Sequence, residues 1–505
     1  MRELVENPQH RLLMQTSATV VLALIFISLL LKARQKKLPL LNGKRHNEFT
    51  LSNAKSRFLL NAEELIRSGL TKVTFRICTD VGTHIMVSPE YANEIRNHEH
   101  LIVDNIIADL FHSDIPGFEA FRADFLNRKL LTKTLSKCLN PSLGALTEAV
   151  SAQAALGLKD RWGDSSEWKE VILKPTVLRL VSRLSCRVFC GEELCDNDDW
   201  LRITEDYTVT ADTTAKKLWL WPWPMRYVVH WFMPSCQILR SYLTEAREIL
   251  NPIIEKRKIE RLQREKVTKT ENGDMIDWLE DTADGGFYEP IAAQLVLSVA
   301  AIHTTSDMLT QVVYDVFQRP ELVNDLRQEL ISVVREQGSF NGACLSQLKL
   351  MDSVLKESQR LKPFSLTSMH RRATENVTLS DGLQIAKGWE IEMPCLHMWD
   401  DTVYPGGKEF VPDRFLKMRQ ISGQENKHQL VSTSSNHLGF GYGKYACPGR
   451  FFAAVEVKTA LSHILMSYDV KLVDDAPAPH RIGVVMAANV LGRVAVRGRQ
   501  PEVSL

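Results

Sequence analysis

The chain has 505 residues, of which 44% are hydrophobic and 24% are charged, so it can bury a large core and is neither disordered nor fibrous. Its 62 basic and 61 acidic residues give a formal net charge of +1, which provides no electrostatic footprint for nucleic acid. Nine cysteines are spread along the chain without a C-x-x-C pair, a usage typical of a reducing compartment rather than of a disulfide scaffold.

The first element in chain order is the apolar segment 12–31 (LLMQTSATVVLALIFISLLL). It is about 20 residues long and can therefore cross a bilayer as one helix. A cleaved signal peptide is the alternative, but no small-x-small cleavage site follows the segment. Basic residues are more numerous after it than before it, which places its C-terminal side in the cytosol: Lys32, Arg34, Lys36 and Lys37 against Arg2 and Arg11. We expect residues 1–37 to be a membrane anchor and residues 38–505 to be one cytosolic domain.

Beyond the anchor, helical patterns dominate the sequence. Leu38-Pro39-Leu40 is expected to begin a short extended linker. Few segments have strand patterns, and they are 73–77, 84–87, 388–393 and 493–497. The sequence therefore predicts a mainly α fold with a small β-sheet region.

The longest predicted helix begins at Glu289-Pro290 and runs to Phe317 without glycine or internal proline. At 1.5 Å per residue it would be roughly 40 Å long, and its middle is apolar nearly all round, which predicts a buried helix. It contains His303-Thr304-Thr305. Such groups either bond to the preceding turn as core polar residues or serve a function.

The segment GFGYGKYACPG, around Cys447, admits several hypotheses. A phosphate loop is excluded because Ser or Thr does not follow the lysine. A zinc or iron–sulfur site needs several soft ligands, and no second cysteine lies near Cys447. A catalytic thiol with His437 as its base is possible, although no spacing singles out that pair.

A single thiolate metal ligand is the remaining hypothesis. Pro448 at the first position of the helix predicted over RFFAAVEVKTALSHIL would place Cys447 at a helix N-terminus, where thiolate is favoured. Phe440 can lie against a flat ligand, and glycines permit the backbone to approach it: Gly441, Gly443 and Gly449. A lone thiolate beneath a planar cofactor describes a haem-thiolate site.

The pattern Phe440-x-x-Gly443-x-x-x-Cys447-x-Gly449 resembles the cysteine-loop signature of the cytochrome P450 family. The family's other landmarks occur in order along the chain, as Ala300-Ala301-Ile302-His303-Thr304-Thr305, Glu357-x-x-Arg360 and Pro412-x-Arg414-Phe415. The resemblance covers essentially the whole chain. It implies a cytochrome P450 fold with one N-terminal transmembrane helix, located in the endoplasmic reticulum membrane.

The resemblance also implies roles for individual residues. Cys447 is expected to be the axial ligand of the iron of haem b, in a loop with Phe440 and the three glycines. Thr304 is expected to help deliver protons during oxygen activation. A charge-assisted triad is expected to hold the cysteine loop in place: Glu357, Arg360 and Arg414.

The chain departs from the family pattern at several positions. His303 stands where an acidic residue is usual and can relay protons nearer neutral pH. Tyr445 replaces the usual Arg or His two residues before the cysteine, so Arg371 and Arg128 are the expected haem-propionate partners. Asp124 stands where a tryptophan is common.

The resemblance implies the activity of a monooxygenase that uses O2. Because the chain has no flavin or dinucleotide motif, the electrons are expected to come from NADPH and to be delivered by cytochrome P450 reductase. Basic residues near the thiolate are expected to dock the reductase: Lys444, Arg450 and Lys458. A haem-thiolate isomerase or dehydratase that needs no reductase is one alternative. A non-catalytic haem-binding or scaffold protein is another.

The expected substrate site lies above the haem and is small and apolar, which favours a lipophilic molecule such as a terpenoid. Its expected residues are Ala300, Ala301, 364–367, 484–488 and 114–118. The stretches NGKRHNEF and AAIHTTSDML resemble filamentous-fungal members of the family that modify terpenoid and related secondary metabolites.

Overall fold

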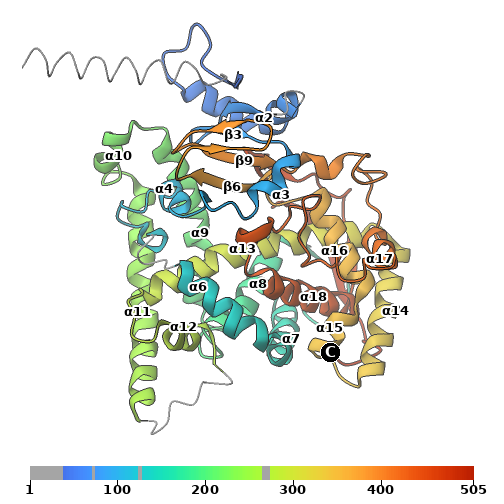
Figure 1. Cartoon of the computed structure of the whole chain (residues 1–505). Coiled ribbons are helices and arrows are strands. Elements are labelled where there is room, and N and C mark those ends of the chain that lie inside the picture. The colour runs from blue at the N-terminus through green and yellow to red at the C-terminus, as the bar shows by residue number, and fades with distance from the viewer. Residues whose placement is uncertain (1–37, 71–73, 123–127, 264–272) are drawn as a thin grey trace, which may run out of the picture.

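The computed structural model describes residues 38–70, 74–122, 128–263 and 273–505, and helices dominate these ranges (Figure 1). The mainly α class is therefore confirmed. The helices are α2 (Ser52–Leu70), α3 (Ala92–Ile95), α4 (Ile106–Leu110), α6 (Arg128–Thr134), α7 (Asn140–Trp162), α8 (Leu173–Phe189), α9 (Asp198–Trp219), α10 (Trp223–Val229), α11 (Pro234–Gln263), α12 (Met275–Ala283), α13 (Pro290–Phe317), α14 (Pro320–Gln337), α15 (Gly342–Gln347), α16 (Lys349–Leu361), α17 (Arg414–Arg419) and α18 (Arg450–Ser467).

A six-stranded mixed sheet lies at one end of the molecule, beneath α2, in the order β1-β2-β3-β9-β6-β4 (Figure 1). Its strands are β1 (Leu40–Leu41), β2 (Phe75–Cys78), β3 (Thr83–Met86), β4 (Leu101–Ile102), β6 (Thr367–Ala373) and β9 (Glu390–Pro394). The pairs β1–β2 and β3–β9 are parallel, and the other pairs are antiparallel.

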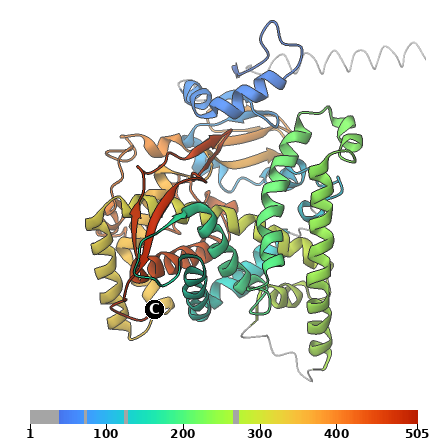
Figure 2. The same cartoon turned by 180° about the vertical axis from the view of Figure 1, so that it is seen from behind.

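Smaller sheets complete the strand inventory of the described residues. A three-stranded sheet has the order β10-β13-β5, and two hairpins pair β11 with β12 and β7 with β8. Their strands are β5 (Lys169–Ile172), β7 (Val377–Thr378), β8 (Gln384–Ile385), β10 (Tyr468–Leu472), β11 (His480–Ile482), β12 (Val485–Ala487) and β13 (Arg493–Gly498). Figure 2 shows β10 and β13 on the face that Figure 1 hides.

The four predicted strands correspond to β2, β3, β9 and β13, with bounds shifted by one or two residues. Two predictions about extended chain need correction. The expected linker at Leu38–Leu40 is instead the start of the sheet, because Leu40 and Leu41 pair with Arg76 and Ile77. Strand β6 was missed because Arg371 occupies one of its buried positions, which breaks the apolar alternation that identifies a strand.

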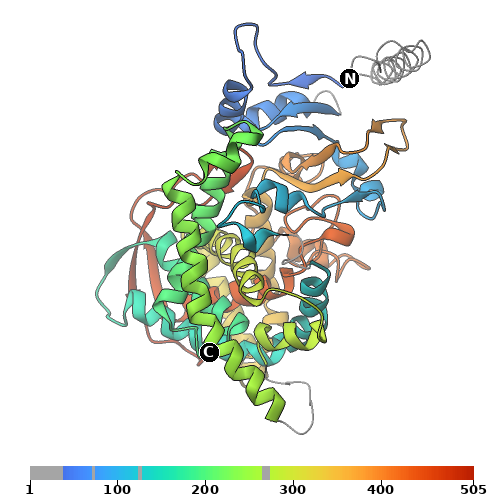
Figure 3. The same ribbon diagram turned by 90° about the vertical axis from the view of Figure 1, so that its left-hand side faces the viewer.

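Helix α13 has the predicted bounds and crosses the centre of the molecule (Figure 1). The Glu289 carboxylate caps its first turn by accepting a hydrogen bond from Ala292 N. The helix packs against α8, α9, α16 and α18, which is why its apolar surface extends around the whole cylinder. The long helix α11 runs along one side of the fold (Figure 3).

The predicted membrane span, 12–31, lies outside the described residues. Within the parts of the chain that the structure describes, no helix combines the length and the apolar composition needed to cross a bilayer.

Helix α18 buries one carboxylic acid, Glu456, against α8. The side chain has no exposed surface, and Ser185 Oγ donates to Glu456 Oε1 at 2.7 Å. Among the described residues, Oε2 has no hydrogen-bond partner. Because desolvation penalises the carboxylate, burial raises the pKa of Glu456 to about 8.

We predict that Glu456→Gln becomes progressively more stable than the wild-type chain as the pH rises from about 5 to 8. Glu456 ionises in the unfolded chain near its ordinary pKa of 4.5 but in the folded chain only near 8. Raising the pH through that window therefore favours the unfolded wild type by roughly 1.4 kcal/mol per pH unit. Thermal unfolding of both proteins at several pH values measures this difference. The exposed Glu336→Gln is the matched control, and a stability difference between Glu456→Gln and the wild type that stays constant with pH would contradict the prediction.

Candidate active site

Cys447 lies in a loop whose backbone closes on itself. Cys447 N donates to the Phe440 carbonyl at 2.8 Å, and Gly441 N donates to the Leu438 carbonyl at 2.8 Å. Gly443 has a φ of +78°, and a Cβ there would lie 2.4 Å from the Arg96 Cβ. Only glycine allows this turn and this approach. The glycine thus packs the loop against the chain after α3, a role that the sequence did not indicate.

The helix after the cysteine begins later than predicted. Gly449 is the N-cap and Arg450 the first helical residue of α18, so Pro448 precedes the helix instead of opening it. The N–H groups of Gly449 and Arg450 nevertheless donate to the Cys447 sulfur. Desolvation outweighs these donors and raises the pKa of Cys447. The helix N-terminus alone therefore does not keep the sulfur ionised, whereas a coordinated metal cation does.

A cavity of about 330 Å³ lies between α13 and the cysteine loop. Cys447 is exposed, and it borders this cavity together with Phe440 and Gly449. Most of the other lining residues are apolar or small: Leu135, Phe189, Leu297, Ala300, Ala301, Met308, Pro363, Phe364, Leu438, Gly439, Pro448, Phe452 and Ala453. The polar lining residues are Thr304, Thr305, Asp307, Gln359, Lys362, Ser365, Thr367 and Ser368.

The predicted substrate residues divide among three cavities. Ala300, Ala301 and part of the segment 364–367 line the cavity next to Cys447. Val484 and Val485 line a neighbouring cavity of about 270 Å³, which shares Ser365 and Thr367 with the first. Asp114 and Ile115 line a third cavity of about 280 Å³ beneath α10.

Thr304 borders the cavity, and its hydroxyl bonds to the preceding turn of α13. Its Oγ1 donates back to the Ala300 carbonyl at 2.8 Å, as a core threonine does. Because the hydroxyl proton is engaged there, the lone pairs of the oxygen are available to accept a proton donor in the cavity.

The structure does not bring His303 to this cavity. Its Nε2 lies 2.9 Å from the Glu205 carbonyl of α9, and burial lowers the pKa of His303. The ring is therefore neutral and donates to α9. The predicted relay through His303 is not supported by a contact with Thr304 in the structure.

Asp307, which the sequence analysis did not single out, is the acidic residue in the cavity wall. Its Oδ1 accepts a hydrogen bond from Ala488 N at 2.5 Å and lies 3.5 Å from Lys174 Nζ. Burial raises the pKa of Asp307 and lowers that of Lys174. Asp307 could have been identified from the sequence, because it is a charged residue three positions after Thr304 and therefore lies on the same face of a buried helix.

Arg128 and Arg371, the predicted propionate partners, meet at Tyr445. The two guanidinium carbons lie 4.6 Å from the centroid of the tyrosine ring, one from α6 and one from β6. Arg371 is buried, which lowers its pKa to about 10. Within the described ranges, Arg371 Nε and Nη2 and Arg128 Nη1 have no hydrogen-bond partner, although Arg128 Nη1 lies 3.6 Å from Asp104. Buried donors in this state need a hydrogen-bond acceptor, and a carboxylate suits two guanidinium groups best. Asp124 lies outside the described residues.

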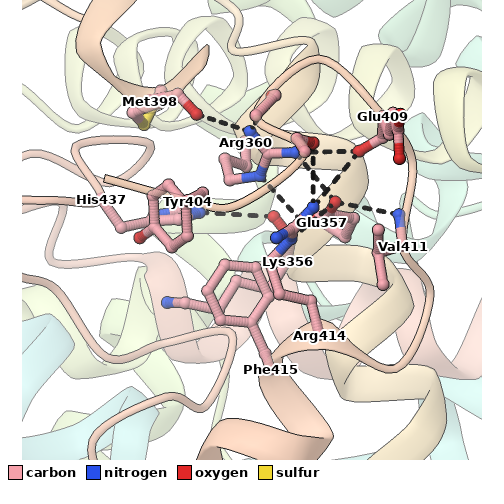
Figure 4. Close-up of polar contacts among 12 residues, drawn as sticks. Lys356, Glu357, Arg360, Met398, Tyr404, Glu409, Val411, Arg414, Phe415 and His437 are labelled. Carbon is pink, nitrogen blue, oxygen red and sulfur yellow. Dashed lines mark hydrogen bonds and ion pairs between the residues drawn. The ribbon is translucent and has the colours of Figure 1, made fainter. Parts of the chain in front are cut away.

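The predicted triad is assembled around the fully buried Glu357 carboxylate (Figure 4). Arg360 donates to both Glu357 oxygens at 2.8 Å, and Arg414 Nε lies 3.0 Å from Oε1. Val411 N also donates to Glu357, at 3.0 Å. The remaining guanidinium protons bind backbone carbonyls of the segment 398–409, which is irregular after the 3-10 helix Leu396–Trp399: those of Met398, Pro405, Gly406, Gly407 and Glu409.

Lys356 extends this network to the cysteine segment. Its Nζ donates to the carbonyls of Gln429 and Ser432, and its own carbonyl lies 3.3 Å from His437 Nε2. The triad therefore acts on the cysteine loop through its neighbour on α16. His437 is buried, and its pKa is well below the usual range. Its ring is hydrogen-bonded to the Lys356 carbonyl and not to Cys447, which argues against a catalytic Cys–His pair.

The basic residues expected to dock a reductase differ in their surroundings. Lys444 is exposed, and Arg450 is half-buried and donates to the Cys447 carbonyl. The expectation for Lys458 is wrong, because Lys458 is buried and its Nζ lies 2.7 Å from Asp352.

Comparison with known proteins identifies relatives along nearly the whole chain. The family model described as "Cytochrome P450" matches residues 78–490. The cytochrome P450 monooxygenase adrA of Penicillium rubens is 44% identical over 498 residues, 96% of each chain. The cytochrome P450 monooxygenase esdpI of Penicillium shearii is 41% identical over 500 residues, 98% of each chain.

Among solved structures, the retinoic-acid-bound cyanobacterial CYP120A1 aligns with a TM-score of 0.67 and 17% identity, covering 92% of this chain and 99% of that one. This likeness shows a shared fold.

We predict that Glu357→Gln destabilises the protein by about 3–5 kcal/mol, because it leaves two buried guanidinium groups without their carboxylate. Urea unfolding followed by intrinsic fluorescence measures the loss. Glu255→Gln, which removes one side of the exposed Glu255–Lys258 pair, should cost less than about 1 kcal/mol. Equal losses in the two variants would refute the triad's structural role.

Proposed function

Because the chain belongs to the cytochrome P450 family, we propose that it binds haem b through Cys447 and inserts one oxygen atom from O2 into a lipophilic substrate, with electrons from NADPH. The single observation that carries this proposal is that Cys447 and Thr304 border one largely apolar cavity. Haem held there by a thiolate would supply the activation of O2.

The residues around the cavity fit such a cofactor. The Cys447 sulfur receives two backbone N–H donors and would serve as the axial ligand. Buried guanidinium N–H groups of Arg371 and Arg128 have no hydrogen-bond partner among the described residues, and these would bind the two carboxylates of haem. Nothing in the chain resembles a C-x-x-C-H attachment motif, which supports a non-covalently bound haem b.

Thr304 and Asp307 are the chain's own groups for handling protons in this cavity. The Thr304 Oγ1 can accept a hydrogen bond while its own O–H group donates to the Ala300 carbonyl. Asp307 lies on the same helix face, and its raised pKa makes proton exchange near neutrality more accessible than for an ordinary carboxylate. His303 would contribute by fixing α13 to α9 through the Glu205 carbonyl.

The substrate that we propose is a terpenoid or a related fungal secondary metabolite. More than half of the residues that line the cavity are apolar or small, which favours a mainly hydrocarbon ligand. The similarity to monooxygenases of Penicillium species supports a fungal context.

The electron donor that we propose is NADPH–cytochrome P450 reductase. The exposed Lys444 and the partly exposed Arg450 provide positive charge on the surface next to the thiolate loop, which suits an acidic partner. An isomerase or dehydratase would need no such donor, and the Thr304 hydroxyl in the cavity favours the oxygenase.

We also propose that the catalytic domain, residues 38–505, is held on the cytosolic face of the endoplasmic reticulum membrane by a helix in residues 1–37. Large exposed apolar side chains cluster on and around α10, at the same end of the molecule as α2 in all three views (Figures 1 to 3): Leu220, Trp221, Trp223, Met225, Tyr227, Val228, Trp231 and Phe232. An exposed patch rich in tryptophan suits a lipid interface.

We predict that Arg371→Leu weakens haem retention by roughly 10-fold or more, because it removes charged hydrogen bonds to a carboxylate. The rate at which haem passes from the protein to an excess of a haem-binding acceptor measures this change without reference to turnover. Arg319→Leu removes a guanidinium stacked on Phe410 outside the cavity and should leave the rate unchanged. A wild-type rate in Arg371→Leu would show that Arg371 does not contact haem.

We predict that the purified chain oxidises its substrate only when NADPH and a fungal cytochrome P450 reductase are both present, and that Cys447→Ala is inactive. The chain is expressed in a host that is fed candidate terpenoids, and the products are analysed by mass spectrometry. The product masses identify the substrate and show whether an oxygen atom has been added. Cys138→Ala, which changes a half-buried cysteine in the π-helical segment Leu135–Leu139 that joins α6 to α7, should retain activity. Turnover without NADPH and reductase would support the isomerase or dehydratase, and turnover by Cys447→Ala would overturn the ligand assignment.

A further inference from the structure

Four ionisable side chains form a ring on adjacent strands of the six-stranded sheet, away from Cys447. Glu390 and Glu392 lie two apart on β9 and thus on one face of the sheet. His84 on β3 and His370 on β6 flank them on either side, and the centroids of the two imidazole rings are 5.1 Å apart.

The ring has one carboxylate oxygen at each end of the histidine pair. Glu392 Oε1 lies 2.5 Å from His84 Nδ1 and 3.9 Å from His370 Nδ1. Glu390 Oε2 lies 2.5 Å from His370 Nε2 and 3.6 Å from His84 Nε2. Both Nδ1 atoms therefore face Glu392, and both Nε2 atoms face Glu390.

This arrangement is similar to a metal site in which histidines bind the ion and a carboxylate orients the histidines. Metal-bound histidines usually donate the ring nitrogen that does not bind the metal to a carboxylate, which fixes the tautomer and aims the other nitrogen at the metal. Glu392 is placed for that role. Two imidazoles and one carboxylate are a donor set of zinc sites, and potential ligand atoms of His84, His370 and Glu390 all lie within 4.8 Å of one another.

The negative charge around the ring also favours the binding of a divalent cation. Arg372 lies 2.6 Å from both Glu390 Oε1 and Asp109 Oδ2, so with neutral imidazoles three carboxylates face one guanidinium. Asp80 faces His84 as well, although burial raises the pKa of Asp80. The excess of two negative charges, counted without Asp80, is neutralised either by protonating both imidazoles or by binding one divalent cation.

The ring can be reached from two cavities. His84 and Glu390 line the cavity beneath α10, and His84, His370 and Glu392 line the neighbouring cavity that shares Ser365 and Thr367 with the one at Cys447. An ion thus has an entry path, and a solvent-facing coordination position is available.

We propose that His84, His370 and Glu390 bind one divalent cation of the zinc class, with Glu392 orienting the two imidazoles. The bound ion joins β3, β6 and β9 in the wall of the two cavities that these residues line. This site is independent of the proposed monooxygenase reaction.

Zinc binding to the haem-loaded full-length protein tests the proposal. The protein in detergent is equilibrated with ZnCl2 and desalted, and zinc and iron are measured by plasma mass spectrometry, while competition with a fluorescent zinc chelator gives the affinity. Haem occupies Cys447 in this form, so the axial cysteine cannot contribute. We expect one zinc per haem iron.

Three variants and one control localise the ion. Glu392→Gln should weaken zinc binding by about 10–100-fold while keeping all three ligands, and His370→Ala and Glu390→Gln should weaken it at least as much. His480→Ala, on the exposed strand β11, should bind zinc as the wild type does. Unchanged haem content and melting temperature in the variants confirm that the fold is intact.

The pH dependence provides a second readout. Zinc must displace protons from both imidazoles, so the affinity should fall as the pH is lowered from about 7.5 to 6. The proposal would be overturned if the wild type bound no more zinc than His370→Ala does. It would also be overturned if the zinc affinity did not change with pH or with Glu392→Gln, and the four side chains would then be joined by hydrogen bonds alone.

Discussion

The structure depends above all on the buried carboxylate of Glu357. A carboxylate without exposed surface is costly unless its charge is paired and its oxygens accept hydrogen bonds, and here two guanidinium groups and the Val411 amide satisfy both conditions. The benefit to the fold lies in what the arginines do with their other protons. They bind carbonyls of the segment 398–409, which after the short 3-10 helix Leu396–Trp399 has no strand or helix in which to pair them.

That segment supports the cysteine loop from one side, and α16 supports it from beneath. A Cβ at Gly439 would lie 2.4 Å from Gln359 Oε1, so the loop approaches α16 closely. Lys356, Gln359 and Glu357 belong to the same two turns of that helix. One short helix thus carries the charge pair, the lysine bonds to residues 429 and 432, and the surface on which the loop rests. The position of Cys447 relative to α13 follows from these contacts.

The sequence predicted the parts of this site that depend on local pattern. The long helix from Pro290 to Phe317 and the mainly helical class follow from residue type and spacing, and both are found in the structure. The four landmarks were identified by resemblance to the family, and the structure brings Glu357, Arg360 and Arg414 of two of them together. The sequence did not predict groups that converge from distant segments. His84 and Glu392 are 308 positions apart, and Asp307 meets the Ala488 amide from another element. The errors have the same origin. The direction of the His303 side chain and the burial of Lys458 are set by tertiary packing, because α9 offers a carbonyl to the first and Asp352 a carboxylate to the second.

Tyr445 stands between guanidinium groups that come from α6 and β6. An aromatic face attracts a cation without adding a charge of its own. Two segments outside the cysteine loop therefore contribute the guanidinium groups at this position, and Lys444 of the loop adds an ammonium group 5.2 Å from the ring centroid. In this chain, the larger part of the charge that an acidic group would meet beside Tyr445 can change without any change in the cysteine loop.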